Sequence, residues 1–351
     1  MLTPKKRVEA AIRGEKADRI PFTIYENKLP QCSVERQLRN EGLCLVNRNY
    51  NVITAYSPNV VHESYGYYEN GTRYNRDVFK TPFGKLFSVH RPSGITSWCV
   101  SRLFKTPEDY KKLLFMAKDE VFKPCYERFL AAEKLVGEDV ILRANIGLTP
   151  LHRVITHWMG VETFAIEWAD RRDEIEKLCD ALTEKLRIIF PIVAKSPALH
   201  ANFGGNETGN VMGRERFQKY VIPLYNEAGE IFKKNGKFLG AHLDGNNKVW
   251  ADLVADSGLD YIEAFSPSPD SDMTISDAFK VWNKKLLWIN FPSSLHLATH
   301  EKIKTETRKI IGESLPDKRL IIGITEDIPE ERWQGNLLAM SEVINKGSLD
   351  F

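Results

Sequence analysis

Short apolar runs alternate with longer amphipathic stretches along most of the chain. Six apolar runs follow one another from residue 140 onward, at 140–146, 199–203, 238–242, 261–265, 286–290 and 320–324. Two more precede them, one at residues 20–25 and one near Val60. Nearly continuous apolar runs of this length are typical of strands buried on both faces of a parallel sheet. The pattern therefore predicts eight strands.

Amphipathic stretches with helical spacing separate the later runs, at residues 214–235, 274–284, 300–312 and 330–345. A further helix is predicted at roughly 33–43, and another begins at Thr3-Pro4, a favoured N-cap and first helical residue, and ends at Gly14. Eight alternating units in 351 residues favour a closed barrel over an open doubly wound sheet. We predict an α/β fold, a (β/α)8 TIM barrel with an N-terminal helical segment.

The sequence pattern changes between residues 57 and 105, where short β-rich runs replace the alternation of apolar runs and helices. Turn signals at Asn70-Gly71 and at Pro82-Phe83-Gly84 separate β-rich runs such as 85–90 and 96–100. We interpret this segment as an antiparallel β excursion inserted after the second strand, so that residues 1–351 form a single TIM-barrel domain.

Composition excludes several classes of protein. Hydrophobic residues make up 42% and charged residues 27%, which is typical of a globular chain, and a net charge of +2 is too small for an electrostatic nucleic-acid binder. We find neither a signal peptide nor an apolar stretch that approaches the length of a membrane span. Five cysteines without a CxxC pair are typical of free thiols. We therefore expect a cytoplasmic location.

Polar residues follow most of the predicted strands. In a (β/α)8 barrel, the carboxyl ends of the strands form the active-site face. The residues expected there, in chain order, are Tyr25, His62, Glu63, Asn145, Thr149, Asn202, Glu207, His242, Asp244, Glu263, Asn290 and Glu326.

Among these residues, the His242-x-Asp244 pair is the most specific indication of a functional site. Residues two apart on a strand point to the same side, so the imidazole and the carboxylate can converge on one point. A carboxylate from another strand end would complete a set that suits Zn²⁺ with one open position. Glu326 is our first choice for the third ligand, and Glu263 and Glu207 are alternatives. Asp244 as a cap of the following helix is the simpler interpretation.

Two other motifs are weaker. The segment Gly204-Gly205-Asn206-Glu207-Thr208-Gly209 lacks the Gly-Lys-Ser/Thr ending of a phosphate loop, and we interpret it as a turn that lets backbone approach a ligand. His296 and His300 have helical spacing but lack the Glu of a zincin motif, so we predict a solvated pair.

Several segments resemble the uroporphyrinogen decarboxylase superfamily, which includes cobamide-dependent methyltransferases. They are residues 3–8 with 14–21 (Gly-Glu-Lys-Ala-Asp-Arg-Ile-Pro), residues 214–225, Gly236-Lys237 leading to His242-x-Asp244-Gly245-Asn246, and residues 336–340. The likeness spans nearly the whole chain. It identifies the superfamily well and the reaction poorly.

The resemblance separates two branches. The decarboxylase carries an Arg-rich segment after the first strand, whereas this chain has Tyr25-Glu26-Asn27-Lys28-Leu29-Pro30 there. Thiol-methylating members of the methyltransferase branch hold zinc by His-x-Cys and a distant Cys. Asp244 stands where the first Cys would be, and Glu326 stands near the second. Carboxylates suit an oxygen-bound Lewis acid better than a thiolate exchanger, so a thiol is the less favoured substrate.

The resemblance thus implies an O-demethylating methyltransferase. Zinc on His242, Asp244 and Glu326 would polarise a methoxy compound, expected to be aromatic, and cob(I)alamin would take the methyl group. The chain has no Asp-x-His-x-x-Gly motif, so cobalamin would arrive on a separate corrinoid protein docking at the barrel mouth. Neither nucleic acid nor membrane is expected as a partner, and a homodimer is left open. Substrate contacts are expected from Glu207, Glu263, Asn290, Tyr25 and Asn202.

Three other functions remain open at this point. They are a porphyrinogen decarboxylase without metal, a methylcobamide:thiol methyltransferase, and a barrel that binds small molecules without chemistry.

Overall fold

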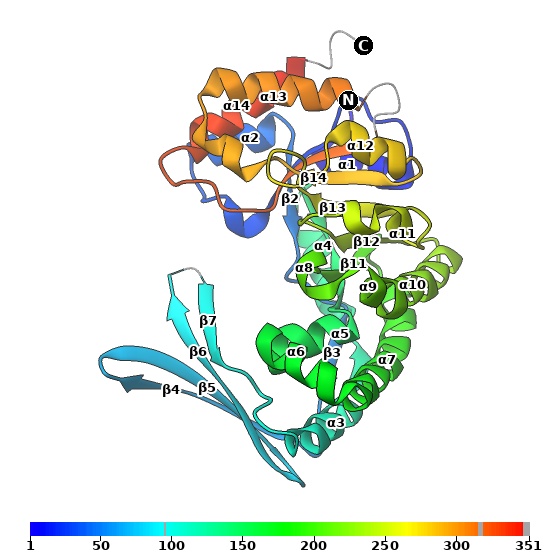
Figure 1. Ribbon diagram of the computed structural model, residues 1–351. Coiled ribbons are helices and arrows are strands. Elements are labelled where there is room, and N and C mark those ends of the chain that lie inside the picture. The colour runs from blue at the N-terminus through cyan, green and yellow to red at the C-terminus, as the bar shows by residue number, and fades with distance from the viewer. Residues whose placement is uncertain (95, 315–318, 347–351) are drawn as a thin grey trace. The chain divides into compact units, whose positions relative to one another are not determined.

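The computed structural model of the chain describes residues 1–94, 96–314 and 319–346. The chain groups into two compact units (Figure 1). Unit 1 comprises Met1–Val52, Cys125–Gly147 and Val193–Phe351, and unit 2 comprises Ile53–Pro124 and Leu148–Ile192. No helix in the described ranges combines the length and the apolarity that crossing a bilayer requires.

Unit 1 is built on a sheet in which all neighbouring strands are parallel, with the order β10-β11-β12-β13-β14-β15-β1-β2-β9. The strands are β1 Phe22–Tyr25, β2 Leu43–Asn47, β9 Val140–Leu142, β10 Ala144–Gly147, β11 His200–Gly205, β12 Phe238–His242, β13 Tyr261–Phe265, β14 Leu286–Asn290 and β15 Leu320–Ile324.

The two end strands of this order are consecutive in sequence. β9 pairs with β2, β10 pairs with β11, and only Arg143 stands between β9 and β10. One bent segment therefore joins the two sides of the sheet, and eight strand positions complete a ring. The predicted (β/α)8 barrel is confirmed, and β12 to β15 have the predicted boundaries.

The second barrel strand is not the one that the sequence predicted. We expected it near Val60, but β2 covers Leu43–Asn47 and Val61–Glu69 forms β4 of unit 2. The predicted helix at 33–43 ends at Asn40, since α2 covers Ser33–Asn40. The sequence pattern does not predict the five-residue strand at 43–47, which begins only three residues after α2 ends.

Helices flank the ring (Figure 1). In α1, the Thr3 side chain accepts a hydrogen bond from the Lys6 amide and Gly14 ends the helix at φ 70°, as predicted. The predicted helix at 214–235 is divided near Pro223. The other helices of unit 1 are α4 Glu127–Leu135, α8 Gly209–Met212, α9 Arg214–Tyr220, α10 Ile222–Lys234, α11 Ala251–Ala255, α12 Ile275–Val281, α13 His300–Glu313 and α14 Trp333–Lys346, with short turns η1 Glu26–Lys28, η3 Lys248–Trp250 and η4 Ser293–Leu297.

Large side chains fill the ring. Tyr261 and Trp288 are almost fully buried, and their ring centroids lie 5.9 Å apart. They pack in one cluster with Ile321, Val46 and other buried residues. The barrel is therefore a packed core, and chemistry with a ligand belongs at its mouth.

Unit 2 contains the predicted antiparallel excursion. Its four-stranded sheet has the order β4-β5-β6-β7, and a two-stranded sheet pairs β3 with β8. Asn70 and Gly71 both have positive φ at the β4–β5 turn, as a tight hairpin of this sequence requires. The elements are β3 Ile53–Tyr56, β4 Val61–Glu69, β5 Thr72–Thr81, β6 Gly84–Ser93, β7 Thr96–Ser101, β8 Val121–Pro124, α3 Asp109–Asp119, α5 Pro150–Arg153, η2 Val154–Met159, α6 Val161–Asp170 and α7 Arg172–Ala194, whose last residues belong to unit 1.

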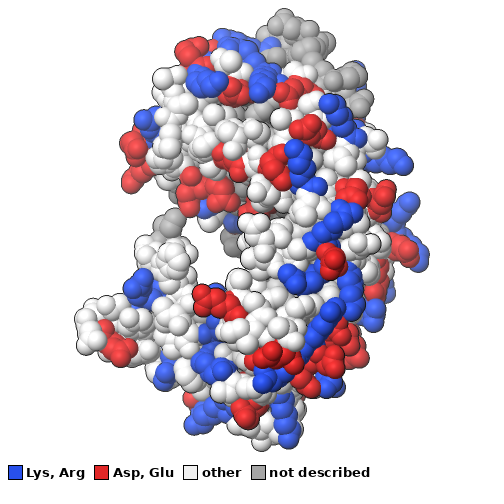
Figure 2. All heavy atoms as spheres, viewed as in Figure 1, with Lys and Arg blue, Asp and Glu red and all other residues white. Residues whose placement is uncertain are grey.

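Both signs of charge are present on the visible surface. Lys and Arg side chains lie interspersed with Asp and Glu side chains on the face shown in Figure 2, with uncharged areas between them. This matches the 49 basic and 47 acidic residues of the chain.

Candidate metal centre

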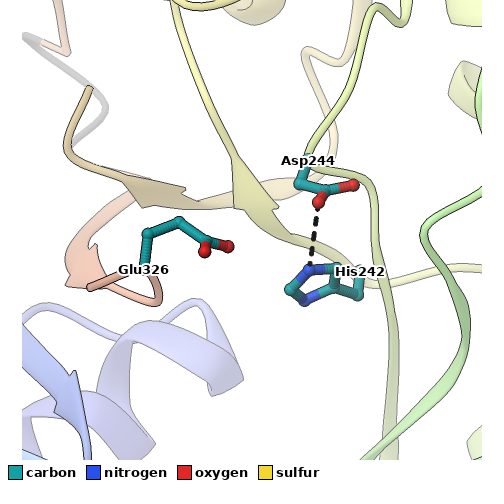
Figure 3. Close-up of side chains that lie close together, drawn as sticks. All are labelled: His242, Asp244 and Glu326. Atoms are coloured by element: carbon teal, nitrogen blue, oxygen red, sulfur yellow. Dashed lines mark ion pairs between the residues drawn. The ribbon is translucent and has the colours of Figure 1, made fainter. Parts of the chain in front are cut away.

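Three predicted ligands come together in unit 1. His242 is the last residue of β12, Asp244 follows two residues later, and Glu326 lies just after β15. One ligand atom from each side chain lies within 4.8 Å of the others (Figure 3). The Nε2 atom of His242 and an Asp244 carboxylate oxygen are 3.6 Å apart. Of the described residues, this is the one group of three or more His, Cys, Asp or Glu side chains close enough to hold a metal ion.

The donor set fits a divalent cation. Zinc with bonds of about 2.0–2.1 Å holds tetrahedral ligand atoms roughly 3.3 Å apart, so small side-chain movements would close this triad around an ion. Desolvation and the neighbouring Asp244 charge raise the pKa of Glu326, although the cation of Lys28 opposes them. A bound cation would relieve this repulsion between carboxylates.

Glu263 on β13 contacts the same histidine from the other side. One of its oxygens lies 2.7 Å from His242 Nδ1 and accepts a 2.9 Å hydrogen bond from Asn202. The other oxygen accepts a 2.8 Å hydrogen bond from Arg143 and one from the Tyr25 hydroxyl. Glu263 is completely buried. A buried carboxylate of this kind is stable because a cation and several donors surround it.

The charges of this group are strongly coupled. Burial by itself would raise the pKa of Glu263, but the cation of Arg143 and the interactions with His242 hold it well below its usual range. Burial would lower the pKa of His242, but the charge of Glu263 and the hydrogen bond with Asp244 raise it to about 10. A metal ion binds the unprotonated form of an imidazole nitrogen, so metal binding at Nε2 would compete with protonation of His242.

Sequence comparison places the chain in a family. The family model described as uroporphyrinogen decarboxylase (URO-D) matches residues 93–347, which is 255 of the 351 residues. The chain belongs to the URO-D family. The predicted superfamily is confirmed. No functionally curated protein matches the chain.

A solved structure has the same fold as this URO-D family member. A methyltransferase from Methanosarcina mazei matches with a TM-score of 0.61 and 13% identity, over 99% of both chains. At that identity the likeness concerns the fold. A sugar phosphate isomerase/epimerase from Parabacteroides distasonis (14% identity, 93% of each chain) has a TM-score of 0.34. Dispersin B (14% identity, 64% of this chain and 78% of that one) has a TM-score of 0.31.

The residues predicted to contact substrate are engaged within the URO-D barrel itself. Tyr25 and Asn202 donate hydrogen bonds to the Glu263 carboxylate, as described above. Asn290 accepts a 2.9 Å hydrogen bond from the Thr325 amide and connects β14 to the loop after β15. Glu207 is buried, and its carboxylate accepts a 2.8 Å hydrogen bond from the Gly205 amide. These contacts stabilise the barrel mouth, and a substrate role for these residues stays a prediction.

Two arginines of the site were missed by the sequence reasoning. Arg143 is 6% exposed and lies inside the apolar run at 140–146. A single charged residue within a predicted buried strand could have indicated a functional role. Arg48 follows β2, and its guanidinium lies 3.5 Å from the centre of the Tyr25 ring. It was missed because β2 itself was missed.

Other sequence candidates lie elsewhere. His62 and Glu63 are on β4 of unit 2, where His62 pairs with Asp77 at 3.0 Å, so they are not at the end of a barrel strand. Thr149 also belongs to unit 2, and Asn145 is in β10. The predicted solvated histidine pair is wrong for His296. This residue is 1% exposed because η4 folds it against the core.

Proposed function

We propose that this URO-D family protein is a zinc-dependent methyltransferase, the demethylating component of a corrinoid system. It would move a methyl group from a methoxylated aromatic compound to the cob(I)alamin of a separate corrinoid protein. The observation that carries the proposal is the convergence of His242, Asp244 and Glu326 at the carboxyl ends of the barrel strands. The fold shared with the Methanosarcina mazei methyltransferase supports it.

The donor types favour an oxygen substrate. His242, Asp244 and Glu326 would hold the metal through one nitrogen and two oxygens, a set that suits Zn²⁺ with an open position. Zinc held there supplies Lewis acidity towards an ether oxygen. Cysteine ligands, which suit exchange of a substrate thiolate, are missing from this triad, so an oxygen-linked methyl donor is favoured over a thiol acceptor.

The chain's residues prepare the site before the substrate arrives. Glu263 and Asp244 hold the His242 ring between them, at 2.7 and 3.6 Å. In the reaction, the methyl–oxygen bond breaks, its electron pair stays on the aryl oxygen, and the methyl group forms a bond with cobalt. The aryl oxide then takes a proton from water. Because attack in line with the breaking bond would bring cob(I)alamin to the methyl carbon, the corrinoid protein would dock at the strand ends that carry His242, Asp244 and Glu326.

One assay tests this function directly. The zinc-loaded protein, a corrinoid protein with reduced cobalamin and a panel of methoxyarenes are mixed, and the cobalt absorbance is followed. Formation of methyl-cobalt is expected. Glu326→Gln should lower the rate about 100-fold or more, because it removes a charged ligand. The control Glu330→Gln changes an exposed carboxylate of the same loop and should leave the rate unchanged.

A porphyrinogen decarboxylase is the second candidate, favoured by the description of the matching family model. It needs no metal and no corrinoid protein. Turnover of a porphyrinogen by the metal-free protein, with no methyl-cobalt from any methoxyarene, would favour this candidate over our proposal.

A further inference from the structure

Two backbone irregularities flank the strand that carries His242. In β11, the pairing with β12 changes register between Asn202 and Gly205. In β13, the pairing with β14 changes register between Glu263 and Phe265. β-Bulges frequently lie beside active sites, where they redirect a side chain. Here one irregularity lies on each side of β12.

The irregularity in β11 brings backbone against His242. A Cβ atom on Gly205 would lie 2.9 Å from the Cβ atom of His242, and Gly205 has a φ of 144°. The Asn206 amide donates a 3.2 Å hydrogen bond to the His242 carbonyl. Only glycine allows this approach, which fixes the backbone of His242.

The irregularity in β13 follows Glu263 directly. Ala264 has a φ of 59°, a left-handed conformation that residues other than glycine rarely adopt. It is fully buried in the β13 strand. The conformation interrupts the alternation of side chains immediately after Glu263, the residue that contacts His242.

The four hydrogen bonds to Glu263 use its full accepting capacity. An ionised carboxylate offers about four lone-pair sites. Arg143 and Tyr25 donate to one oxygen, and Asn202 and His242 Nδ1 contact the other. A metal ion would have to displace one of these donors to use Glu263 as a ligand. The geometry therefore opposes the earlier alternative of Glu263 as the third ligand.

From these contacts we infer that Glu263 is a positioning residue for the metal ligand His242, and that Arg143 supports it. Glu263 keeps the proton on Nδ1 and turns Nε2 towards Asp244 and Glu326. Arg143 balances the buried charge of Glu263. Carboxylates that orient a histidine ligand in this way typically contribute a 10- to 100-fold gain in metal affinity. The inference rests on the proposed metal site at His242.

Zinc affinity, measured by competition with a chromophoric chelator, tests the inference without an activity assay. Glu263→Gln keeps the size of the side chain, loses its charge and should weaken zinc binding 10- to 100-fold. The absorption spectrum of the Co²⁺-loaded variant should also change, because the imidazole is no longer held in one orientation. Glu35→Gln is the matched control. Glu35 is also buried and paired with an arginine, Arg39 at 2.7 Å, on α2, so zinc affinity should not change.

A second pair of variants separates the backbone contribution. Gly205→Ala places a methyl group against His242 and should weaken zinc binding about tenfold. Gly236→Ala is its control. Gly236 also has a positive φ, of 66°, but an added Cβ atom there meets nothing within 4 Å, so backbone strain is tested without the clash.

The outcomes are distinct. Wild-type zinc affinity and Co²⁺ spectrum in folded Glu263→Gln and Gly205→Ala proteins would overturn the inference. Unchanged zinc binding by His242→Ala and Glu326→Ala would instead overturn the proposed metal site. If Glu263→Gln does not fold, Tyr25→Phe decides, because it keeps the Glu263 charge and removes one hydrogen bond to Glu263 together with a longer, 3.4 Å contact to His242 Nδ1. It should weaken zinc binding a few-fold, and an unchanged affinity would count against the inference.

Discussion

Single buried polar residues carry much of the chemistry of this protein. Glu263 and Arg143 are almost fully buried within or between barrel strands and are held by mutual pairing. Breaking such a pair typically costs 3–5 kcal/mol, because the remaining charge is left without a partner. His242 differs from them, since one of its ring nitrogens faces the buried carboxylate and the other faces the open triad.

His296 provides a pH-dependent test at this scale. Burial lowers the pKa of His296 to about 4, with a smaller opposing effect of Asp270, whereas the unfolded value is about 6.5. Between these values the unfolded chain binds more protons, so stability falls as the pH falls. The expected loss from this group is about 2 kcal/mol between pH 7 and pH 5.

Urea unfolding at both pH values measures this effect. The His296→Gln variant should lose less stability on acidification than the wild type does. The control Thr305→Ala changes an exposed residue without a titratable group and should keep the wild-type pH dependence. An identical pH dependence in His296→Gln and wild type would contradict the prediction.

Secondary-structure elements of the barrel are delimited largely by local signals. Thr274 forms a capping box at the start of α12. Its side chain accepts a hydrogen bond from the Asp277 amide, and the Asp277 side chain accepts one from the Thr274 amide. At the start of α13, the Thr299 side chain likewise accepts a hydrogen bond from the Lys302 amide. These helices therefore begin where short polar side chains satisfy the first amides.

Removal of the capping box should destabilise the protein measurably. Thr274→Ala is expected to cost about 1 kcal/mol, because an amide of the first turn of α12 loses its acceptor. Thr305→Ala is the control, since Thr305 is exposed in the interior of α13 and alanine favours helix there. Denaturant unfolding compares the two variants. Equal stabilities would contradict a capping role for Thr274.

At the scale of the whole chain, the candidate centre connects distant segments of unit 1. His242 and Asp244 are about 80 residues from Glu326 in sequence, and the barrel topology alone brings β12 and β15 to one mouth. A metal ion on this triad would therefore stabilise unit 1 by cross-linking strands that do not pair directly.

Zinc should accordingly protect one unit selectively. At a free zinc concentration of 100 times Kd, binding adds about 2.7 kcal/mol to the stability of the folded state. Hydrogen exchange with and without zinc should show slower exchange in β12, β13 and β15. The strands β4 to β7 of unit 2 serve as the internal control and should not change. Equal protection of both units, or none, would contradict a zinc site in the barrel.

The amino-acid pattern determined the class of fold and most of the strands. Continuous apolar runs define β12 to β15, because strands buried on both faces need apolar side chains at every position. The two-residue repeat of a strand predicted that the side chains of His242 and Asp244 point to the same side. β2 escaped detection because a run of five residues next to a helix gives too little periodic signal.

Only the tertiary structure decided how the site is assembled. Arg143 and Glu263 are 120 residues apart, and nothing local in either segment indicates that they pair. Glu263 and Glu326 look alike as carboxylates at strand ends. The fold surrounds Glu263 with four donors and leaves Glu326 beside Asp244 and His242. Burial and hydrogen-bond partners distinguish the two residues, and both depend on long-range packing that no short stretch of sequence encodes.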